Sequence, residues 1–315
     1  MTKNDCRIVF MGTPELARTV LEAELSAGFN VVAAVTQPDK PKGRGGKVAV
    51  SPVKELCLEK GIPVLQPERA KSDEFFEELK SFEPDMITVA AYGKILPKRV
   101  LELPPLGCIN VHTSLLPKYR GAAPIQWPIL NGDSETGATI MFMDEGCDTG
   151  DIIAQERIAI ADDETGETLH DKVAECGAKL LCETLLHILD GSFTRTPQDH
   201  SLSTYVGMMD KELGHLDFTK SARELERYVR GLSPWPGTFT YVNGKLLKIK
   251  KAAVKENSTD AAPGTIIRGK GCLDIVTGDG ILSVTELQPE GKKAMGAADY
   301  LNGIKDELKV TEQQS

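Results

Sequence analysis

Short apolar segments rich in β-branched residues alternate with longer amphipathic segments through the first 112 residues of this 315-residue chain. The short segments predict strands over 7–11, 30–36, 62–65, 85–90 and 108–112, and the longer ones predict helices over 15–27, 52–60 and 72–82. Ser51 and Pro52 favour a helix start, and Gly61 favours a helix stop. Because repeated strand–helix–strand units give parallel strands, the sequence predicts a doubly wound, mostly parallel α/β sheet.

The turn after the first strand, Gly12-Thr13-Pro14, argues against a dinucleotide site. It lacks the Gly-x-Gly-x-x-Gly spacing that lets the backbone approach a pyrophosphate. No acidic residue ends the second strand either, where Thr36-Gln37-Pro38 stands. The sheet is therefore predicted to be Rossmann-like without the usual dinucleotide cofactor.

Asn110 and His112 end the strand predicted over 108–112. Side chains alternate along a strand, so both point to one face, at the carboxyl end where open α/β sheets bind ligands. Each residue alone is more often a structural polar group. Together, next to the irregular loop that follows, an amide donor and an imidazole base are the groups that acyl transfer requires.

Asp148 lies further along, in the segment Asp144-Glu145-Gly146-Cys147-Asp148-Thr149-Gly150. One interpretation makes it a turn residue, because Asp before Thr-Gly is common turn chemistry. The other makes it the carboxylate that fixes the tautomer of His112 and stabilises its protonated form. Sequence spacing alone does not bring Asp148 to His112.

The cysteines argue against disulfides and structural metals. Seven are scattered along the chain, without Cys-x-x-Cys or a Cys/His cluster. Cys108 shares a face with His112, but four strand residues span roughly 13 Å, too far for a Cys–His pair. The N-terminus runs directly into a strand, and no apolar run approaches the roughly 18 residues of a membrane span. We expect a cytoplasmic monomer in a reducing compartment, with no membrane partner.

The net charge of −9 means that any polyanion must be bound by local basic patches. One candidate is the glycine-rich loop that contains Lys42, Arg44 and Lys47, and another is the strip that contains Lys248 and Lys250. The alternative for the first is a solvated surface loop, and the alternative for the second is a solvated strand edge. For the loop, basic charge in an acidic protein favours contact with a nucleic-acid backbone, and for the strip both interpretations stay open.

The last third of the chain changes in character. A polar segment over 191–203 is a candidate linker, and Ser221-Ala222-Arg223-Glu224 is a capping box that predicts a helix. Asn243-Gly244 between two apolar runs predicts a β-hairpin, and more short strands follow. This run of strands predicts a small, separate β-barrel.

These residues together resemble the folate-dependent formyltransferase family. Asn110, His112 and Asp148 match the family's Asn-x-His and downstream Asp, and Ser114, Leu115, Leu116 and Pro117 are similar to its folate-binding loop. Segments 36–39, 231–237 and 291–303 narrow the resemblance to the members that act on methionyl-tRNA. The similarity covers about residues 7–303. Cys147 departs from the pattern, which has an aliphatic residue before the Asp, and this makes the position oxidisable.

The resemblance implies a formyltransferase domain over 1–190 that binds folate, a linker over 191–207 and an OB-like barrel over 208–315 that binds tRNA. It implies 10-formyltetrahydrofolate as formyl donor, tetrahydrofolate as product, initiator methionyl-tRNA as acceptor, and no metal. Asn110, His112 and Asp148 are then catalytic, and the basic loop contacts tRNA. Three alternatives remain: a formyl-folate hydrolase, a sugar-nucleotide or purine-ribotide formyltransferase, and a non-catalytic RNA-binding protein.

Overall fold

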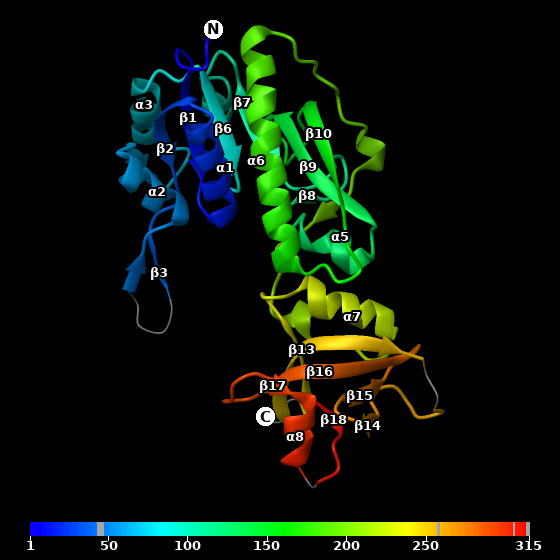
Figure 1. Cartoon of the computed structure of the whole chain (residues 1–315). Coiled ribbons are helices and arrows are strands. Elements are labelled where there is room, and N and C mark those ends of the chain that lie inside the picture. The colour runs from blue at the N-terminus through cyan, green and yellow to red at the C-terminus, as the bar shows by residue number, and fades with distance from the viewer. Residues whose placement is uncertain (43–46, 257–258, 305, 313–315) are drawn as a thin grey trace. The chain divides into compact units, whose positions relative to one another are not determined.

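The computed structural model describes residues 1–42, 47–256, 259–304 and 306–312 (Figure 1). The chain divides into two compact units. The first unit comprises Met1–Pro124, Glu135–Ala159 and His170–Gly207, and the second comprises Ile125–Ser134, Ile160–Leu169 and Met208–Ser315. Each unit is built around its own sheet.

The first unit contains a seven-stranded sheet with the order β10-β9-β7-β6-β1-β2-β5. Its strands are β1 (Arg7–Gly12), β2 (Asn30–Val35), β5 (Val64–Leu65), β6 (Met86–Ala90), β7 (Cys108–His112), β9 (Glu135–Phe142) and β10 (Ile152–Ala159). The strands from β7 to β5 in that order are parallel, and β9 and β10 are antiparallel to their neighbours. The mostly parallel sheet expected from the sequence is confirmed.

Helices cover both faces of this sheet (Figure 1): α1 (Glu15–Ser26), α2 (Pro52–Lys60), α3 (Asp73–Ser81), the short α4 (Lys98–Leu101) and the long α6 (Gly166–Asp190). The Ser51 hydroxyl accepts a hydrogen bond from the Lys54 N–H at 3.2 Å, and Gly61 ends α2 in the left-handed conformation. Phe75 and Leu79 of α3 pack against one face of the sheet. Helices α1 and α6 pack against the other face.

Residues 191–207, which the sequence predicts as a linker, are hydrogen-bonded into the first unit. Thr196 forms a β-bridge with Ile152 of β10. Further along, β11 (Tyr205–Val206) pairs in parallel with β8 (Arg120–Gly121), and a short 3-10 helix (His200–Leu202) lies between these two points. This segment therefore runs beside the loop that follows β7.

The second unit contains an antiparallel, nearly closed barrel with the order β14-β15-β16-β13-β12-β18, and β17 pairs with β16. Its strands are β12 (Thr238–Val242), β13 (Lys245–Lys255), β14 (Ile266–Arg268), β15 (Leu273–Val276), β16 (Ile281–Pro289), β17 (Met295–Gly296) and β18 (Val310–Thr311). The expected hairpin turn joins β12 to β13, with Asn243 and Gly244 both at positive φ. The expected barrel is confirmed.

Helices α5 (Gln126–Asn131), α7 (Ala222–Gly231) and α8 (Ala297–Asn302), with a short 3-10 helix (Glu212–Gly214), complete the second unit. The capping box forms, because the Ser221 hydroxyl accepts from the Glu224 N–H at 3.2 Å. Leu225 and Val229 of α7 pack into the barrel core. No helix among the described residues is long and apolar enough to cross a membrane.

Candidate active site

Strand β7 brings Asn110 and His112 to the carboxyl edge of the sheet. All five of its residues are buried between β6 and β9, and Asn110 and His112 are 8% and 5% exposed. Such burial normally demands hydrogen-bond partners for polar side chains. Yet the Asn110 amide makes no hydrogen bond to any residue that the structure describes, so its N–H groups remain able to donate to a ligand.

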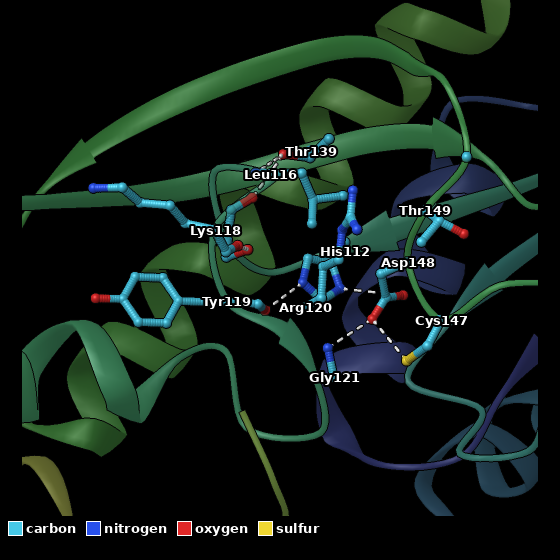
Figure 2. A network of polar contacts seen from close by, with 12 residues as sticks. His112, Leu116, Lys118, Tyr119, Arg120, Gly121, Thr139, Cys147, Asp148 and Thr149 are labelled. Carbon is cyan, nitrogen blue, oxygen red and sulfur yellow. Dashed lines mark hydrogen bonds and ion pairs between the residues drawn. The ribbon is translucent and has the colours of Figure 1, made fainter. Parts of the chain in front are cut away.

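The imidazole of His112 contacts two different groups (Figure 2). Its Nε2 lies 2.9 Å from the main-chain oxygen of Tyr119, and its Nδ1 lies 3.6 Å from Oδ1 of Asp148. A carbonyl oxygen only accepts hydrogen bonds, so Nε2 must carry the proton in the neutral ring. The free electron pair is then on Nδ1, and a proton taken there would face the Asp148 carboxylate.

Asp148 lies in the loop between β9 and β10 and is held by two donors. Its Oδ2 accepts from the Gly121 N–H at 2.8 Å and from the Cys147 thiol at 3.6 Å. Its backbone is in the left-handed region, with φ of 55°. The structure thus brings together the three residues that the sequence places apart.

Cys147 is exposed, and partial burial of its sulfur, with the Asp148 charge nearby, raises the pKa of its thiol. Cys108, at the start of β7, is buried, and this burial raises its thiol pKa to about 12. Neither thiol is therefore activated as a nucleophile. All seven cysteines are free.

The loop from Ser114 to Pro117 uses much of its polar capacity within the protein. The Ser114 hydroxyl donates to the Lys118 carbonyl at 2.7 Å. The Leu116 N–H donates to the Thr139 hydroxyl at 3.2 Å, and its carbonyl accepts from Gln155 at 2.8 Å. Leu115 and Pro117 are half-buried. The loop therefore offers a ligand mainly apolar surface of fixed shape.

The basic residues singled out in the sequence lie in both units. Lys42 and Lys47 are register partners on the hairpin formed by β3 (Lys40–Lys42) and β4 (Lys47–Ala49), while Arg44 lies outside the described residues. In the second unit, Lys248 is exposed and Lys250 half-buried on β13. Within the described ranges, no group of three His, Cys, Asp or Glu side chains could hold a metal ion.

Sequence reasoning missed the atoms that hold the catalytic candidates in place. The Tyr119 carbonyl and the Gly121 N–H are main-chain groups, which carry no residue signature. Gln198 was also missed. Its side chain, 7% exposed, bonds the main chain on either side of Thr149, and only its position in a polar, punctuated segment marked it.

Family models place the chain among known proteins. The formyl transferase family matches residues 6–185, and the formyl transferase C-terminal domain matches residues 208–305. The chain therefore belongs to the formyl transferase family, and it is a formyl-transferring enzyme. The resemblance expected from the sequence is confirmed.

Two individual proteins are similar to this chain over nearly its whole length. The chain is 51% identical over 298 residues to the methionyl-tRNA formyltransferase of Caldanaerobacter subterraneus subsp. tengcongensis, covering 94% of this chain and 96% of the relative. It is 52% identical over 300 residues to the methionyl-tRNA formyltransferase of Myxococcus xanthus, covering 95% of each.

Solved structures share the fold at low identity. The N-formyltransferase of Helicobacter canadensis, in complex with folinic acid and dTDP-3-aminofucose, has a TM-score of 0.64 at 20% identity and covers 89% of this chain and 99% of that one. The sugar 3N-formyl transferase WlaRD, in the presence of dTDP and 5-N-formyl-THF, has a TM-score of 0.66 at 20% identity and covers 91% and 99%.

Proposed function

We propose that this enzyme transfers the formyl group of 10-formyltetrahydrofolate to the amino group of methionine on initiator methionyl-tRNA. The observation that carries the proposal is the contact between the buried His112 and the half-buried Asp148, with the Asn110 amide on the same strand face as His112. Support for the acceptor comes from the relatives at about half identity over nearly their whole length, which are named methionyl-tRNA formyltransferases.

Asn110 serves as the oxyanion donor. As the methionine nitrogen attacks the formyl carbon, negative charge grows on the formyl oxygen, and the new C–N bond forms before the bond to N10 breaks. A fixed amide with no competing partner can donate to that oxygen without rearranging. Removing one such donor costs roughly 3 kcal/mol in comparable sites. The scheme assigns no metal ion, because the hydrogen bond from Asn110 and proton transfer by His112 stabilise the charges that develop during the reaction.

His112 serves as the proton carrier. It accepts the proton of the attacking nitrogen at Nδ1, because the Tyr119 carbonyl keeps the other proton on Nε2. Asp148 then stabilises the imidazolium across the 3.6 Å contact. The proton passes from His112 to N10 as tetrahydrofolate leaves, so atoms and charge balance.

We assign folate binding to the loop formed by Ser114, Leu115, Leu116 and Pro117 after β7. The half-buried Leu115 and Pro117 supply apolar surface that a flat pterin ring can contact, and hydrogen bonds of the buried Ser114 and Leu116 hold the loop in shape. We assign tRNA contacts to Lys42, Arg44 and Lys47, and to Lys248 and Lys250 of the barrel. Residues 1–190 then carry out the transfer, and residues 208–315 help to hold the tRNA.

Formylation of charged initiator tRNA by the purified protein tests the proposal directly. Free methionine and charged elongator methionyl-tRNA are run as parallel acceptors. We expect transfer that is confined to the initiator, and a loss of more than about tenfold in His112→Ala, within the range expected for a general base. Release of formate without a formylated acceptor would identify a hydrolase. RNA binding without turnover would identify a non-catalytic RNA-binding protein.

A further inference from the structure

Gln198 lies in the polar segment after α6, yet it is buried in the first unit at 7% exposure. Its side-chain Nε2 donates to the main-chain oxygens of Asp148 and Gly150, at 2.9 and 2.7 Å. Its Oε1 accepts from the Nη2 and Nε atoms of Arg120, at 2.6 and 3.2 Å. The amide thus uses both of its protons and both of its lone pairs.

The direction of this amide is fixed by its partners. A guanidinium only donates and a carbonyl only accepts, so the oxygen of Gln198 must face Arg120 and its nitrogen must face the two carbonyls. Arg120 is itself 1% exposed and also donates to the Tyr205 hydroxyl at 3.0 Å. A buried guanidinium is costly to leave unpaired, so this arrangement resists displacement.

Asp148 requires such support because its backbone is strained. A non-glycine residue in the left-handed region costs roughly 1 kcal/mol or more and persists only where neighbouring groups hold it. Gln198 donates hydrogen bonds to the carbonyl of Asp148 itself and to that of Gly150, and so holds the loop in place on both sides of Thr149. The orientation of the Asp148 carboxylate toward His112 follows from that backbone position.

The same polar segment also holds the main chain that contacts His112. The Thr204 hydroxyl accepts from the Tyr119 N–H at 2.8 Å, and the Thr204 carbonyl accepts from the Arg120 N–H at 2.8 Å. Tyr119 supplies the carbonyl that bonds Nε2 of His112. One segment therefore fixes the main chain on both sides of the His112–Asp148 contact.

We propose that Gln198 is a positioning residue for formyl transfer, which locks the Asp148 backbone to the buried Arg120 and so keeps the Asp148 carboxylate directed at Nδ1 of His112. The proposal rests on the proposed function, since it takes Asp148 to act through His112. It assigns a catalytic contribution to a segment whose sequence indicates only a linker.

The test compares two substitutions with a matched control in the full-length protein. Gln198→Met removes all four hydrogen bonds at similar size, and Gln198→Glu keeps an acceptor for Arg120 while placing an oxygen against the two carbonyls. We expect both to lower kcat on the order of 100-fold, the scale of a small misplacement of a catalytic group, with KM for folate and tRNA within about threefold. Ser201→Ala, an exposed position in the same segment, should leave kcat unchanged.

A double-mutant cycle separates positioning from general stability. If Gln198 acts through Asp148, Gln198→Met should cause no further loss of kcat in an Asp148→Ala background. An equal loss in both backgrounds, or a kcat of either single variant within about threefold of the wild type, would overturn the proposal. Should Gln198→Met fail to fold, Gln198→Glu in the same cycle decides the question.

A readout without turnover keeps this inference distinct from the proposed function. The ring signals of His112 in NMR spectra at neutral pH report the position of the Asp148 carboxylate. They should move in Gln198→Met and stay in place in Ser201→Ala. If the wild type formylates no methionyl-tRNA, the proposed function fails, and a His112 signal that does not respond to Gln198→Met would overturn the positioning role independently.

Discussion

Glu24 is a fully buried carboxyl group that formyl transfer does not use. It lies on α1, where Oε2 accepts a hydrogen bond from the Thr88 hydroxyl of β6 at 3.3 Å. Its Oε1 finds no partner in the part of the chain that the structure describes. Burial, only partly offset by the Thr88 bond, raises the pKa of Glu24 to about 8. The folded protein therefore keeps Glu24 protonated at neutral pH.

The raised pKa predicts a stability that falls as pH rises. Between the ordinary value of 4.5 and about 8, the unfolded chain releases this proton and the folded chain retains it. The free energy of unfolding should fall by about 1.4 kcal/mol per pH unit in this window, and the loss should be complete above pH 8. Glu24→Gln keeps a neutral side chain of the same size and should remove this dependence.

Urea unfolding at pH 5 and pH 8 checks this prediction. Glu24→Gln should match the wild type near pH 5 and be more stable at pH 8. Glu22→Gln, an exposed change on the same helix, should follow the wild type at both values. A constant difference between Glu24→Gln and the wild type across this range would show that Glu24 is already ionised in the folded state.

Single residues also show where sequence reasoning succeeds. Asn110 and His112 could be placed on one face of β7, because side-chain alternation is a local property of a strand. The approach of Asp148 to His112 could not be predicted, because it depends on the pairing of β7 with β9 and on the loop after β9. The Tyr119 carbonyl lay beyond prediction for a different reason, since main-chain atoms are the same in every residue.

At the scale of helices and strands, the sequence predicts elements that local residues mark, and it does not predict elements that form only through long-range pairing. Helix α2 was predicted to its last residue because Ser51, Pro52 and Gly61 mark its ends. The two-residue strands β8 and β11 exist only through their mutual pairing, across more than 80 residues of sequence. The short helix α5 was missed as well, since Pro128 interrupts any helical pattern there.

The pairing of β8 with β11 predicts a strict requirement for glycine at position 121. Gly121 has φ of 107°, and a Cβ there would lie 2.3 Å from the Val206 carbonyl oxygen. Gly121→Ala should separate the two strands, destabilise the protein by roughly 2 kcal/mol, and displace the N–H that bonds Asp148. Thermal unfolding and kcat measure the two effects.

Gly191→Ala is the matched control for that change. Gly191 also has positive φ, but a Cβ there would meet nothing within 4 Å. It should cost roughly 1 kcal/mol from backbone strain alone and leave kcat unchanged. Equal effects of the two substitutions on kcat would mean that the β8–β11 pairing does not position the site.

The hairpin of β3 and β4 is anchored at its base by three polar side chains. Asp39, just before β3, accepts from Lys54 of α2 at 2.5 Å and from Gln66 at 2.9 Å. Gln66 also accepts from Lys54 at 2.6 Å, which closes the triangle. The hydrogen bonds from Lys54 and Gln66 hold the pKa of Asp39 below its ordinary value. These contacts tie the residue before β3 to α2 and to Gln66.

Breaking this triangle of hydrogen bonds should weaken the use of tRNA and leave the use of folate unchanged. Lys54→Met is expected to raise KM for tRNA by roughly three- to tenfold, because the base of the hairpin loses this anchor and must be held in place when tRNA binds. The KM for folate should not change. Lys60→Met removes an exposed positive charge from the end of the same helix and should have little effect on either KM. A rise with both substrates would indicate a wider folding defect.

At the scale of the whole molecule, charge decides where a tRNA can bind. The net charge is −9, but residues 206–315 carry 16 Lys and Arg against 15 Asp and Glu, so the acidity lies in the preceding part. The average surface of that acidic part repels a polyanion. Attraction to tRNA must then come from a few basic side chains, each contributing a separate share of the salt dependence.

This reasoning predicts a modest salt dependence that can be assigned residue by residue. Raising salt should raise KM for tRNA, with a log–log slope that falls by about 0.7–0.9 for each phosphate contact removed. Arg44→Ala should reduce the slope by about one such step, and the double change Lys248→Ala with Lys250→Ala by about two. The control is Lys179→Ala, an exposed site on α6 for which we propose no tRNA contact, and it should leave the slope unchanged. An unchanged slope in Arg44→Ala would show that the basic loop does not contact tRNA. An unchanged slope in the double variant would show the same for Lys248 and Lys250 of β13.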